Sequence, residues 1–351
     1  MYRRLHAGEQ ATTCECIVCE TAEDTGGVMV GVSGSELHQE LLFAFGGGER
    51  DVTVALLDGL VDRTHDCFIG APLKPLNTAV AQHTGDDAPP SAQATHLASL
   101  LFGQPCRSVE GIAPMCRGLL APIFSDARSV CGQADLADAI TRALDHGADI
   151  ILIGAGAFER PWYPGFALAD AVAKCNASNT LIVTSAGSKG CTTLLRRCGA
   201  LNLLPVAALD SVGQLLGGQC RDLGDIGIAI PGTSVSGAAL EGRVVQRSNP
   251  NVAAGMVAGV AAVLLGVLCR AGGARDPGAV AEAIRMTATP RGALGGSDYP
   301  ATWTGRKSLE TAAAYLTGRY ESAYASSLFE TWYRAQAGAT RSDHAAFRPR
   351  A

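Results

Sequence analysis

The chain alternates between short, continuously apolar runs and longer segments in which apolar residues recur every three or four positions. Runs of the first kind are typical of strands buried on both faces of a parallel sheet, and segments of the second kind predict amphipathic helices. We expect strands at 51–58, 117–124, 149–156, 181–185, 203–208 and 226–230, and helices at 91–102, 134–147, 167–176 and 278–287. Strands and helices that alternate in this way predict an α/β domain, a doubly wound parallel sheet with helices on both faces.

The most apolar stretch of the chain is 252–268, which contains no charged residue. It is rich in Gly and Ala, and it is shorter than the span of about 20 apolar residues that a membrane helix needs. We therefore interpret it as a helix that is buried on all sides and forms the central axis of the fold.

The two ends of the chain differ from this pattern. Residues 1–50 mix polar residues with two short apolar pieces, 27–32 and 41–45, and end in a glycine-rich run. We interpret them as an N-terminal extension, a small hairpin or strand followed by a linker. The main domain is predicted at 51–317, and 318–351 are predicted to hold a C-terminal helix at 320–333 and a polar, disordered tail.

Composition and charge narrow the class of partner. The chain has 351 residues, of which 47% are hydrophobic and 17% charged, and its net charge is -5. This composition is typical of a soluble globular protein, and the negative charge gives no electrostatic reason to expect nucleic acid or an anionic membrane as a partner. Residues 1–20 lack the apolar core of a signal peptide, so we expect a cytoplasmic protein.

Twelve cysteines are scattered along the chain. Without a signal peptide they favour reduced thiols over a disulfide framework. Only Cys14, Cys16 and Cys19 are clustered, and three thiolates could hold a metal ion if His6 or His38 joined them. No fourth ligand stands at the spacing of a structural zinc site, so the alternative is a terminal segment that happens to be rich in cysteine. We expect no metal and no cofactor.

Candidate chemistry gathers at three places in the chain. The strand at 51–58 ends in Asp58-Gly59, and a carboxylate at the carboxyl end of a buried parallel strand lies where α/β proteins place their chemistry. Gln93-Ala94-Thr95-His96 stands near the start of the helix at 91–102, and Ser248-Asn249-Pro250-Asn251 leads into the buried helix.

These motifs, in this order, resemble those of the subtilisin-like (S8) serine proteases, and most of all the branch that processes precursors of cyanobactin-type ribosomal peptides. The matching segments include 54–62, 95–105, 111–118 and 257–259, and the resemblance covers about residues 51–317. It implies a subtilisin-like three-layer fold, with a parallel sheet of about seven strands, helices on both faces and a site at the carboxyl ends of the strands.

A working protease of this family needs a nucleophilic Ser, a His that takes its proton, an Asp that orients the His, and an Asn that helps to hold the oxyanion. The resemblance places Asp58 at the Asp position, but Gln93 at the position of the His. Asn251 stands in place of the Ser, and Ser188 in place of the oxyanion Asn. A glutamine cannot accept a proton near neutral pH, and an asparagine is no useful nucleophile without special activation. We therefore expect a pseudoprotease without peptidase activity.

Two other groups could in principle restore the chemistry. His96 lies a helical turn beyond Gln93, so we expect a packed structural histidine. Gly232-Thr233-Ser234 copies the Gly-Thr-Ser of the family's nucleophile motif, but it follows a strand and no long buried helix comes directly after it. We interpret it as an ordinary loop.

The groove in which the family binds peptides could still bind a peptide after catalysis is lost. The matching segment here is Gly154-Ala155-Gly156, where the resemblance implies that an extended peptide pairs with a strand edge. Main-chain pairing of this kind needs no catalytic residues. The alternative is that these residues only allow a helix and a strand to pack closely.

The main functional hypothesis is a cytoplasmic pseudoprotease that binds a ribosomal precursor peptide, or a modifying enzyme, in natural-product biosynthesis. One alternative is a different enzyme on the same scaffold, acting on a peptide with Asp58 as acid or base and with Gln93 and Asn251 as polar binding groups. Another is a purely structural partner subunit that acts through 1–50 and the C-terminal helix. Residual peptidase activity is the least favoured, and a homo-oligomer stays open.

Overall fold

The computed structural model describes residues 33–42, 44–81, 89–124, 130–154, 157–158, 163–186, 190–216, 226–288, 301–302 and 305–319. The tertiary contacts separate Met1–Val30 from Gly31–Ala351, and every described residue belongs to the second part. The predicted helix at 320–333 and the apolar piece at 27–32 lie outside the described residues. The predicted domain boundaries at 50/51 and 317/318 stay predictions.

The elements follow one another in the alternating order that the hydrophobic pattern predicts. The strands are β1 Thr53–Asp58, β2 Leu73–Pro75, β3 Arg117–Pro122, β4 Val130–Cys131, β5 Ile150–Ile153, β6 Ala157–Phe158, β7 Leu181–Ser185, β8 Leu203–Leu209, β9 Ile228–Pro231, β10 Val235–Ala238, β11 Val244–Arg247 and β12 Ala301–Thr302. The α-helices are α1 Gly34–Leu41, α2 Pro89–Phe102, α3 Gln133–Asp145, α4 Phe166–Ala177, α5 Cys191–Arg197, α6 Pro250–Arg270, α7 Pro277–Met286 and α8 Gly305–Arg319. Short 3-10 turns stand at Ala44–Gly46, Asp66–Phe68 and Leu240–Gly242.

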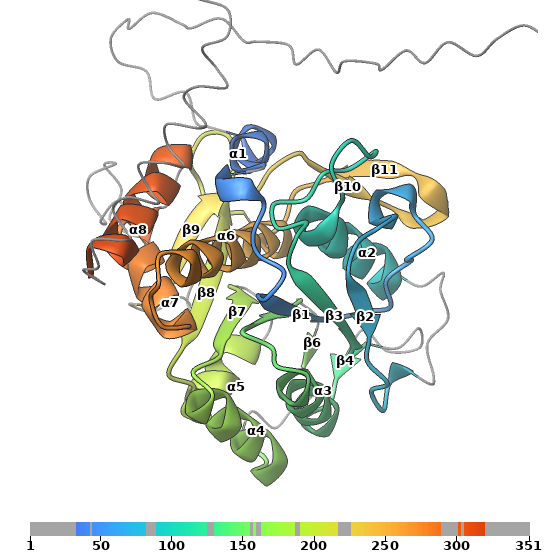
Figure 1. Cartoon of the computed structure of the whole chain (residues 1–351). Helices are drawn as coiled ribbons and strands as arrows, with labels where there is room; N and C mark the ends of the chain where they lie inside the picture. Colours follow the sequence, from blue (N-terminus) through green and yellow to red (C-terminus); the bar gives the residue numbers. More distant parts are fainter. Residues whose placement is uncertain are drawn as a thin grey trace, which may run out of the picture. The chain divides into compact units, whose positions relative to one another are not determined.

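Within the described residues the main sheet has eight strands in the order β12-β9-β8-β7-β5-β1-β3-β2. Figure 1 labels β9, β8 and β7 on one side of it and β1, β3 and β2 on the other. Neighbouring strands in it are parallel throughout. The predicted parallel sheet is therefore confirmed. Its edge strands β2 and β12 have only three and two residues, too few for the hydrophobic pattern to predict them. Smaller two-stranded sheets are formed by β10 with β11 and by β4 with β6.

Helices cover both faces of the sheet, so the central strands contribute to two cores. In β1, Val54 and Leu56 belong to the core that contains α6, whereas Ala55 and Leu57 belong to the core that contains α3, α4 and α5. Since neither face meets water, the strand carries apolar residues at successive positions, which explains its continuous apolar sequence.

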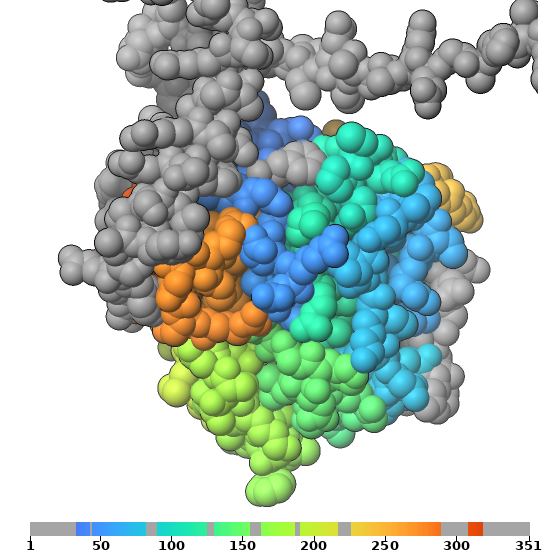
Figure 2. All heavy atoms as spheres, viewed as in Figure 1, coloured from blue at the N-terminus to red at the C-terminus, as the bar shows by residue number. Residues whose placement is uncertain are grey.

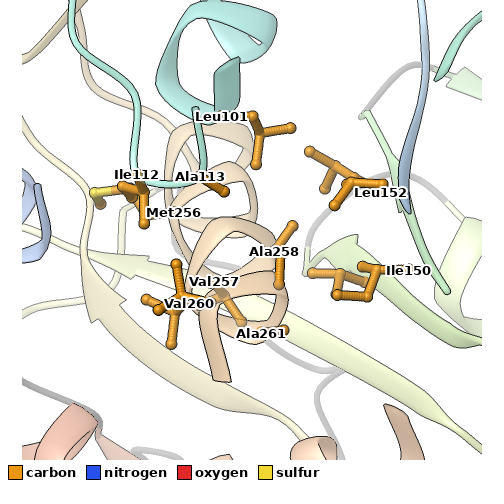
Figure 3. Packing of buried hydrophobic residues seen from close by; sticks show 14 of the residues in the cluster. Leu101, Ile112, Ala113, Ile150, Leu152, Met256, Val257, Ala258, Val260 and Ala261 are labelled. Carbon is orange, nitrogen blue, oxygen red and sulfur yellow. The ribbon is translucent and has the colours of Figure 1, made fainter. Parts of the chain in front are cut away.

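Helix α6 is the axis of the larger core, and its residues from Asn251 to Leu268 are all buried. In Figure 3 its side chains, Ala258 and Val260 among them, lie beside residues of β5, α2 and the loop after α2, such as Leu152 and Ile112. By length and apolar character α6 could also span a membrane, but 94% of its most apolar window is buried inside the protein. The interpretation as a central buried helix is therefore confirmed.

The described part of the N-terminal extension is a helix, and the predicted hairpin or strand is wrong there. Ser33 and Glu36 form a capping box that begins α1. Leu37 and Leu41 are fully buried in the core that α6 shares with α8. The two leucines stand four positions apart, which places them on one face of a helix, and the capping box marks where that helix begins.

The segment that follows α1 is held on the surface of the domain. The carbonyl of Gly47 accepts a hydrogen bond from Met115 N at 3.1 Å, and Glu49 forms an ion pair with Arg270 at the end of α6. In Figure 2 these blue residues lie between the orange residues of α7 and the green to teal residues of the loop before β3.

Candidate functional site

Two helices begin at the carboxyl edge of the sheet and bring predicted site residues there. A Cβ on Gly59, the residue after β1, would lie 2.8 Å from Ser91 N in the first turn of α2. A Cβ on Gly232, the residue after β9, would lie 3.3 Å from the Cβ of Ala253 in the first turn of α6. Both helices therefore start beside the ends of parallel strands, where α/β proteins place their sites.

Helices α2 and α6 also pack directly against each other. A Cβ on Gly255 would lie 3.2 Å from Leu97 Cδ2, so the glycine allows the close approach. Gln93 and Asn251 each stand one helical turn before this contact, toward the start of their helices. The packing therefore holds both residues on the same side of the molecule, at the carboxyl edge.

Asn251 lies on the first turn of α6, as predicted. The helix begins there because the side chain of Asn249 accepts a hydrogen bond from Val252 N at 3.0 Å and Pro250 occupies the first helical position. Only 7% of Asn251 is exposed. The residue at the predicted nucleophile position is thus a nearly buried amide.

Asp58 is buried at the carboxyl end of β1, with 1% of its surface exposed. Its Oδ1 accepts a hydrogen bond from Gly59 N at 2.8 Å, and its Oδ2 accepts one from Gln93 Nε2 at 3.1 Å. Burial raises the pKa of Asp58 to about 7, although these two hydrogen bonds and the charge of Arg247 act in the opposite direction. Near neutral pH the carboxyl group is therefore divided between its acid and carboxylate forms.

Gly154, at the end of β5, gives the carboxyl group of Asp58 its space. A Cβ at this position would overlap Oδ2 of Asp58. The contact is with a side chain of the neighbouring strand β1, so both the peptide-pairing and the helix–strand packing interpretations of this segment stay predictions. The rest of the predicted peptide-binding segment, Ala155 and Gly156, lies outside the described residues, and so does Ser188 at the predicted oxyanion position.

Arg247 reaches the same place from β11, although no motif indicates it. One of its terminal nitrogens donates a hydrogen bond of 3.4 Å to the carbonyl of Ala92, next to Gln93. Its positive charge acts to lower the pKa of both Asp58 and His96. The only signal in the sequence is its position shortly before Asn249, where the central helix begins.

His96 is a packed structural residue, as predicted. It is fully buried, its Nε2 lies 3.2 Å from the carbonyl of Val235, and a Cβ on Gly237 would meet its ring. Burial is the main cause that lowers the pKa of His96 to about 4. The ring thus belongs to the contact between α2 and β10.

Gly232-Thr233-Ser234 forms the turn between β9 and β10 and does not begin a helix. Helix α1 docks on this turn, because Ser35 N donates to the carbonyl of Thr233 at 3.1 Å and Gly34 N donates to Thr233 Oγ1 at 3.4 Å. Ser234 is exposed, and its backbone N–H donates to Ser248 Oγ at 2.8 Å. The loop interpretation is therefore confirmed, and the loop has a structural role.

The cysteines that the structure describes are all free thiols, most of them buried. No three His, Cys, Asp or Glu side chains within the described ranges are grouped so that they could hold a metal ion. The clustered Cys14, Cys16 and Cys19 lie outside those ranges.

Solved structures with a similar fold include enzymes of peptide maturation. A mutant of the protease domain of PatA is 37% identical with a TM-score of 0.67, over 77% of this chain and 97% of that chain. The prenylagaramide maturation protease PagA is 30% identical with a TM-score of 0.67, over 80% and 98% of the two chains. The PatG macrocyclase in complex with peptide is 25% identical with a TM-score of 0.60, over 76% and 92%.

A curated relative that matches the chain in sequence is also a serine proteinase. The chain is 26% identical over 220 residues to the thermophilic serine proteinase of Bacillus sp. (strain AK1), which is 62% of this chain and 53% of that protein. The chain thus spans about half the length of the curated relative that it matches. No protein-family model matches the chain.

Proposed function

The chain belongs to the subtilisin-like protease family, and from that premise we propose that it is a peptidase-inactive member, a pseudoprotease, that binds a ribosomal precursor peptide or a partner enzyme in natural-product biosynthesis. The observation that carries this proposal is the hydrogen bond of 3.1 Å from Gln93 Nε2 to Asp58 Oδ2. The carboxylate of a serine protease orients an imidazole, and here an amide donates to the carboxyl group in its place.

The replacement of the base removes the first step of acyl transfer. A nucleophile must lose its proton as it attacks, and a glutamine side chain has no site that takes a proton near neutral pH. Asn251 adds a second obstacle, because its amide is a poor nucleophile and is nearly buried. We therefore expect no peptide hydrolysis above background.

The relatives support a peptide as the ligand. PatG has been solved as a macrocyclase in complex with peptide, and PagA is named as a maturation protease for prenylagaramide. Binding of an extended peptide by main-chain pairing needs neither the base nor the nucleophile, so it can be kept when catalysis is lost. We therefore propose a precursor peptide of the same kind of pathway as the ligand. We also propose that the protein acts in the cytoplasm. Self-association stays an open alternative.

The second candidate is a different enzyme on the same scaffold, with Asp58 as an acid or base that acts on a bound peptide. The observation that favours it is the pKa of Asp58, which burial raises to about 7. A group with a pKa near the working pH is suited to giving and taking protons in a reaction. In this case a bound peptide would leave with a defined change of mass.

The experiment that separates these candidates is capture of peptides on the immobilised full chain, followed by mass analysis. A random-sequence peptide library is incubated with the wild type and with the Asn251→Ser variant. Retention of intact peptides by both supports the pseudoprotease, since Gln93 still leaves the variant without a base. A defined mass change that disappears in Asp58→Asn supports the second candidate. Retention of no peptide by either protein points to a structural partner subunit.

A further inference from the structure

The hairpin of β10 and β11 carries one positive charge that is balanced and one that is not. Arg243 pairs with Glu241, with 3.4 Å between Nη2 and Oε2, and both side chains are largely exposed. Arg247, at the end of the same hairpin, forms no ion pair within the described ranges. Its guanidinium is nevertheless the one that points toward the site, since it contacts the carbonyl of Ala92.

Most of the hydrogen-bonding capacity of Arg247 is unused. Its Nε is buried and has no hydrogen-bond partner among the described atoms. The bond from its terminal nitrogen to Ala92 is long, at 3.4 Å. A guanidinium carries five N–H donors in a planar fork, and the terminal nitrogens of Arg247 make one hydrogen bond to the described atoms, so they are the donors that could take an added acceptor.

Among the described residues, Asp58 is an acid in the field of Arg247, and it supplies the negative charge only in part. Both oxygens of Asp58 already accept hydrogen bonds, from Gly59 and Gln93. Burial raises the pKa of Asp58 to about 7, so part of it is uncharged near neutral pH. His96, which also lies in the field of Arg247, adds no negative charge. The cation thus stands in a half-buried place without a full counter-ion.

We propose that Arg247 binds the free C-terminal carboxylate of a peptide that ends at the carboxyl edge of the sheet. This inference rests on the proposed function and names the form of peptide that the site takes. A guanidinium fork matches a carboxylate with two parallel hydrogen bonds and is the preferred partner for it in proteins.

The position of Arg247 favours a chain end over an acidic side chain. Its contact with Ala92 sets the guanidinium beside Gln93, and the packing of α2 on α6 holds Asn251 on the same side. A substrate of an active relative would place its reacting carbonyl between such residues. A peptide that stops at this carbonyl presents a carboxylate there, so the ligand is a peptide with a free C-terminus.

The test compares two random-sequence hexapeptide libraries, one with free C-terminal acids and one with C-terminal amides. Equal amounts are captured on the immobilised full chain and quantified by mass spectrometry. We expect the wild type to enrich the acids about ten-fold over the amides, the size of one charge-assisted contact. Arg247→Gln should lose this preference, and Arg247→Lys should keep part of it because the charge remains. The matched control is Arg243→Gln on the same hairpin, which should bind as the wild type does.

The other outcomes would contradict the binding of a C-terminal carboxylate, alone or together with peptide binding. Equal capture of acids and amides by the wild type would overturn the inference and leave peptide binding in place. Enrichment of peptides with internal Asp or Glu in both libraries would overturn it as well, since the carboxylate would then belong to a side chain. Capture of neither library would overturn the inference together with the proposed peptide binding. Thermal unfolding of each variant verifies that a lost preference does not come from a lost fold.

Discussion

At the scale of single residues, the site depends on how Asp58 is surrounded. The carboxyl group is buried at the end of β1, accepts two hydrogen bonds and fills the space left by Gly154. An imidazole in place of Gln93 could carry a positive charge and stabilise the carboxylate, whereas an amide only donates a neutral hydrogen bond. Burial raises the pKa of Asp58, and the neutral hydrogen bond from Gln93 offsets this increase only in part.

The pKa of Asp58 predicts how stability changes with pH. The folded state binds the proton more tightly than the unfolded state, so this contribution to stability is present below a pH of about 4 and is lost as the pH rises through about 7. Asp58→Asn has no such group. Relative to the wild type, the variant should therefore gain about 2 to 3 kcal/mol in free energy of unfolding between pH 5 and pH 8. Urea denaturation at both pH values measures this, and a parallel pH dependence of the two proteins would contradict it.

Gly154 should tolerate no side chain while Asp58 is present. We expect Gly154→Ala to cost about 2 to 4 kcal/mol of unfolding free energy, because the new Cβ overlaps the carboxyl group. The matched control is Gly318→Ala in α8, where a Cβ meets nothing within 4 Å and the change should be neutral or slightly stabilising.

A double variant tests whether Asp58 is the residue that the new Cβ at Gly154 overlaps. If the overlap with Asp58 is the cause, Gly154→Ala combined with Asp58→Ala should cost clearly less than the sum of the two single changes. Strict additivity would show that another contact sets the need for glycine.

Some residues of the candidate site can be predicted from the sequence and others cannot. The resemblance to a known family brings Asp58 and Gln93 together, and the hydrogen bond between them agrees with that placement. Arg247 cannot be found in this way, because it belongs to no motif and enters the site only through the turn of the β10–β11 hairpin. Contacts between segments that are distant in the chain require the fold.

At the scale of elements, patterns that repeat over many residues are predicted well. The strand at 181–185 and the helix at 134–147 coincide with β7 and nearly with α3. Elements with few residues or little periodicity are missed, such as α5, β12 and the hairpin of β10 and β11. Helix α1 is missed within residues 1–50, which the pattern predicts as a hairpin or strand with a linker, although its capping box is visible in the sequence.

Docking of α1 makes the fold sensitive to acid. His38 on α1 is 4% exposed, its Nε2 has no partner among the described atoms, and burial lowers the pKa of His38 to about 4. Between a pH of about 6.5 and a pH of about 4, His38 binds a proton in the unfolded chain but not in the folded state. Stability is therefore lost as the pH falls through this range. His38→Gln should lose about 2 kcal/mol less than the wild type between pH 7 and pH 5.

The measurement is the free energy of unfolding at both pH values, with His146→Gln as the control. His146 is exposed at the end of α3, so His146→Gln removes a histidine without changing the core. If His38→Gln and His146→Gln have equal effects, the acid sensitivity does not arise at α1.

At the scale of the whole molecule, the subtilisin-like architecture is retained around α6. The parallel sheet, the buried axis and the convergence of α2 and α6 at the carboxyl edge all stand in place. On the proposal above, what differs is the chemistry at that edge: Gln93 and Asn251 stand at the predicted positions of the base and the nucleophile, and Arg247 adds a charge. We propose that this scaffold holds a peptide and lacks the groups that would cut it.

The most direct test of this account is mass spectrometry of a random-sequence peptide library after incubation with the purified full chain. A parallel incubation contains Asp58→Asn, and a third contains buffer alone. We predict that the wild type produces no fragments beyond those in buffer, while some intact peptides are retained on the protein. Fragments that form with the wild type and are absent with Asp58→Asn would show a working peptidase and contradict it.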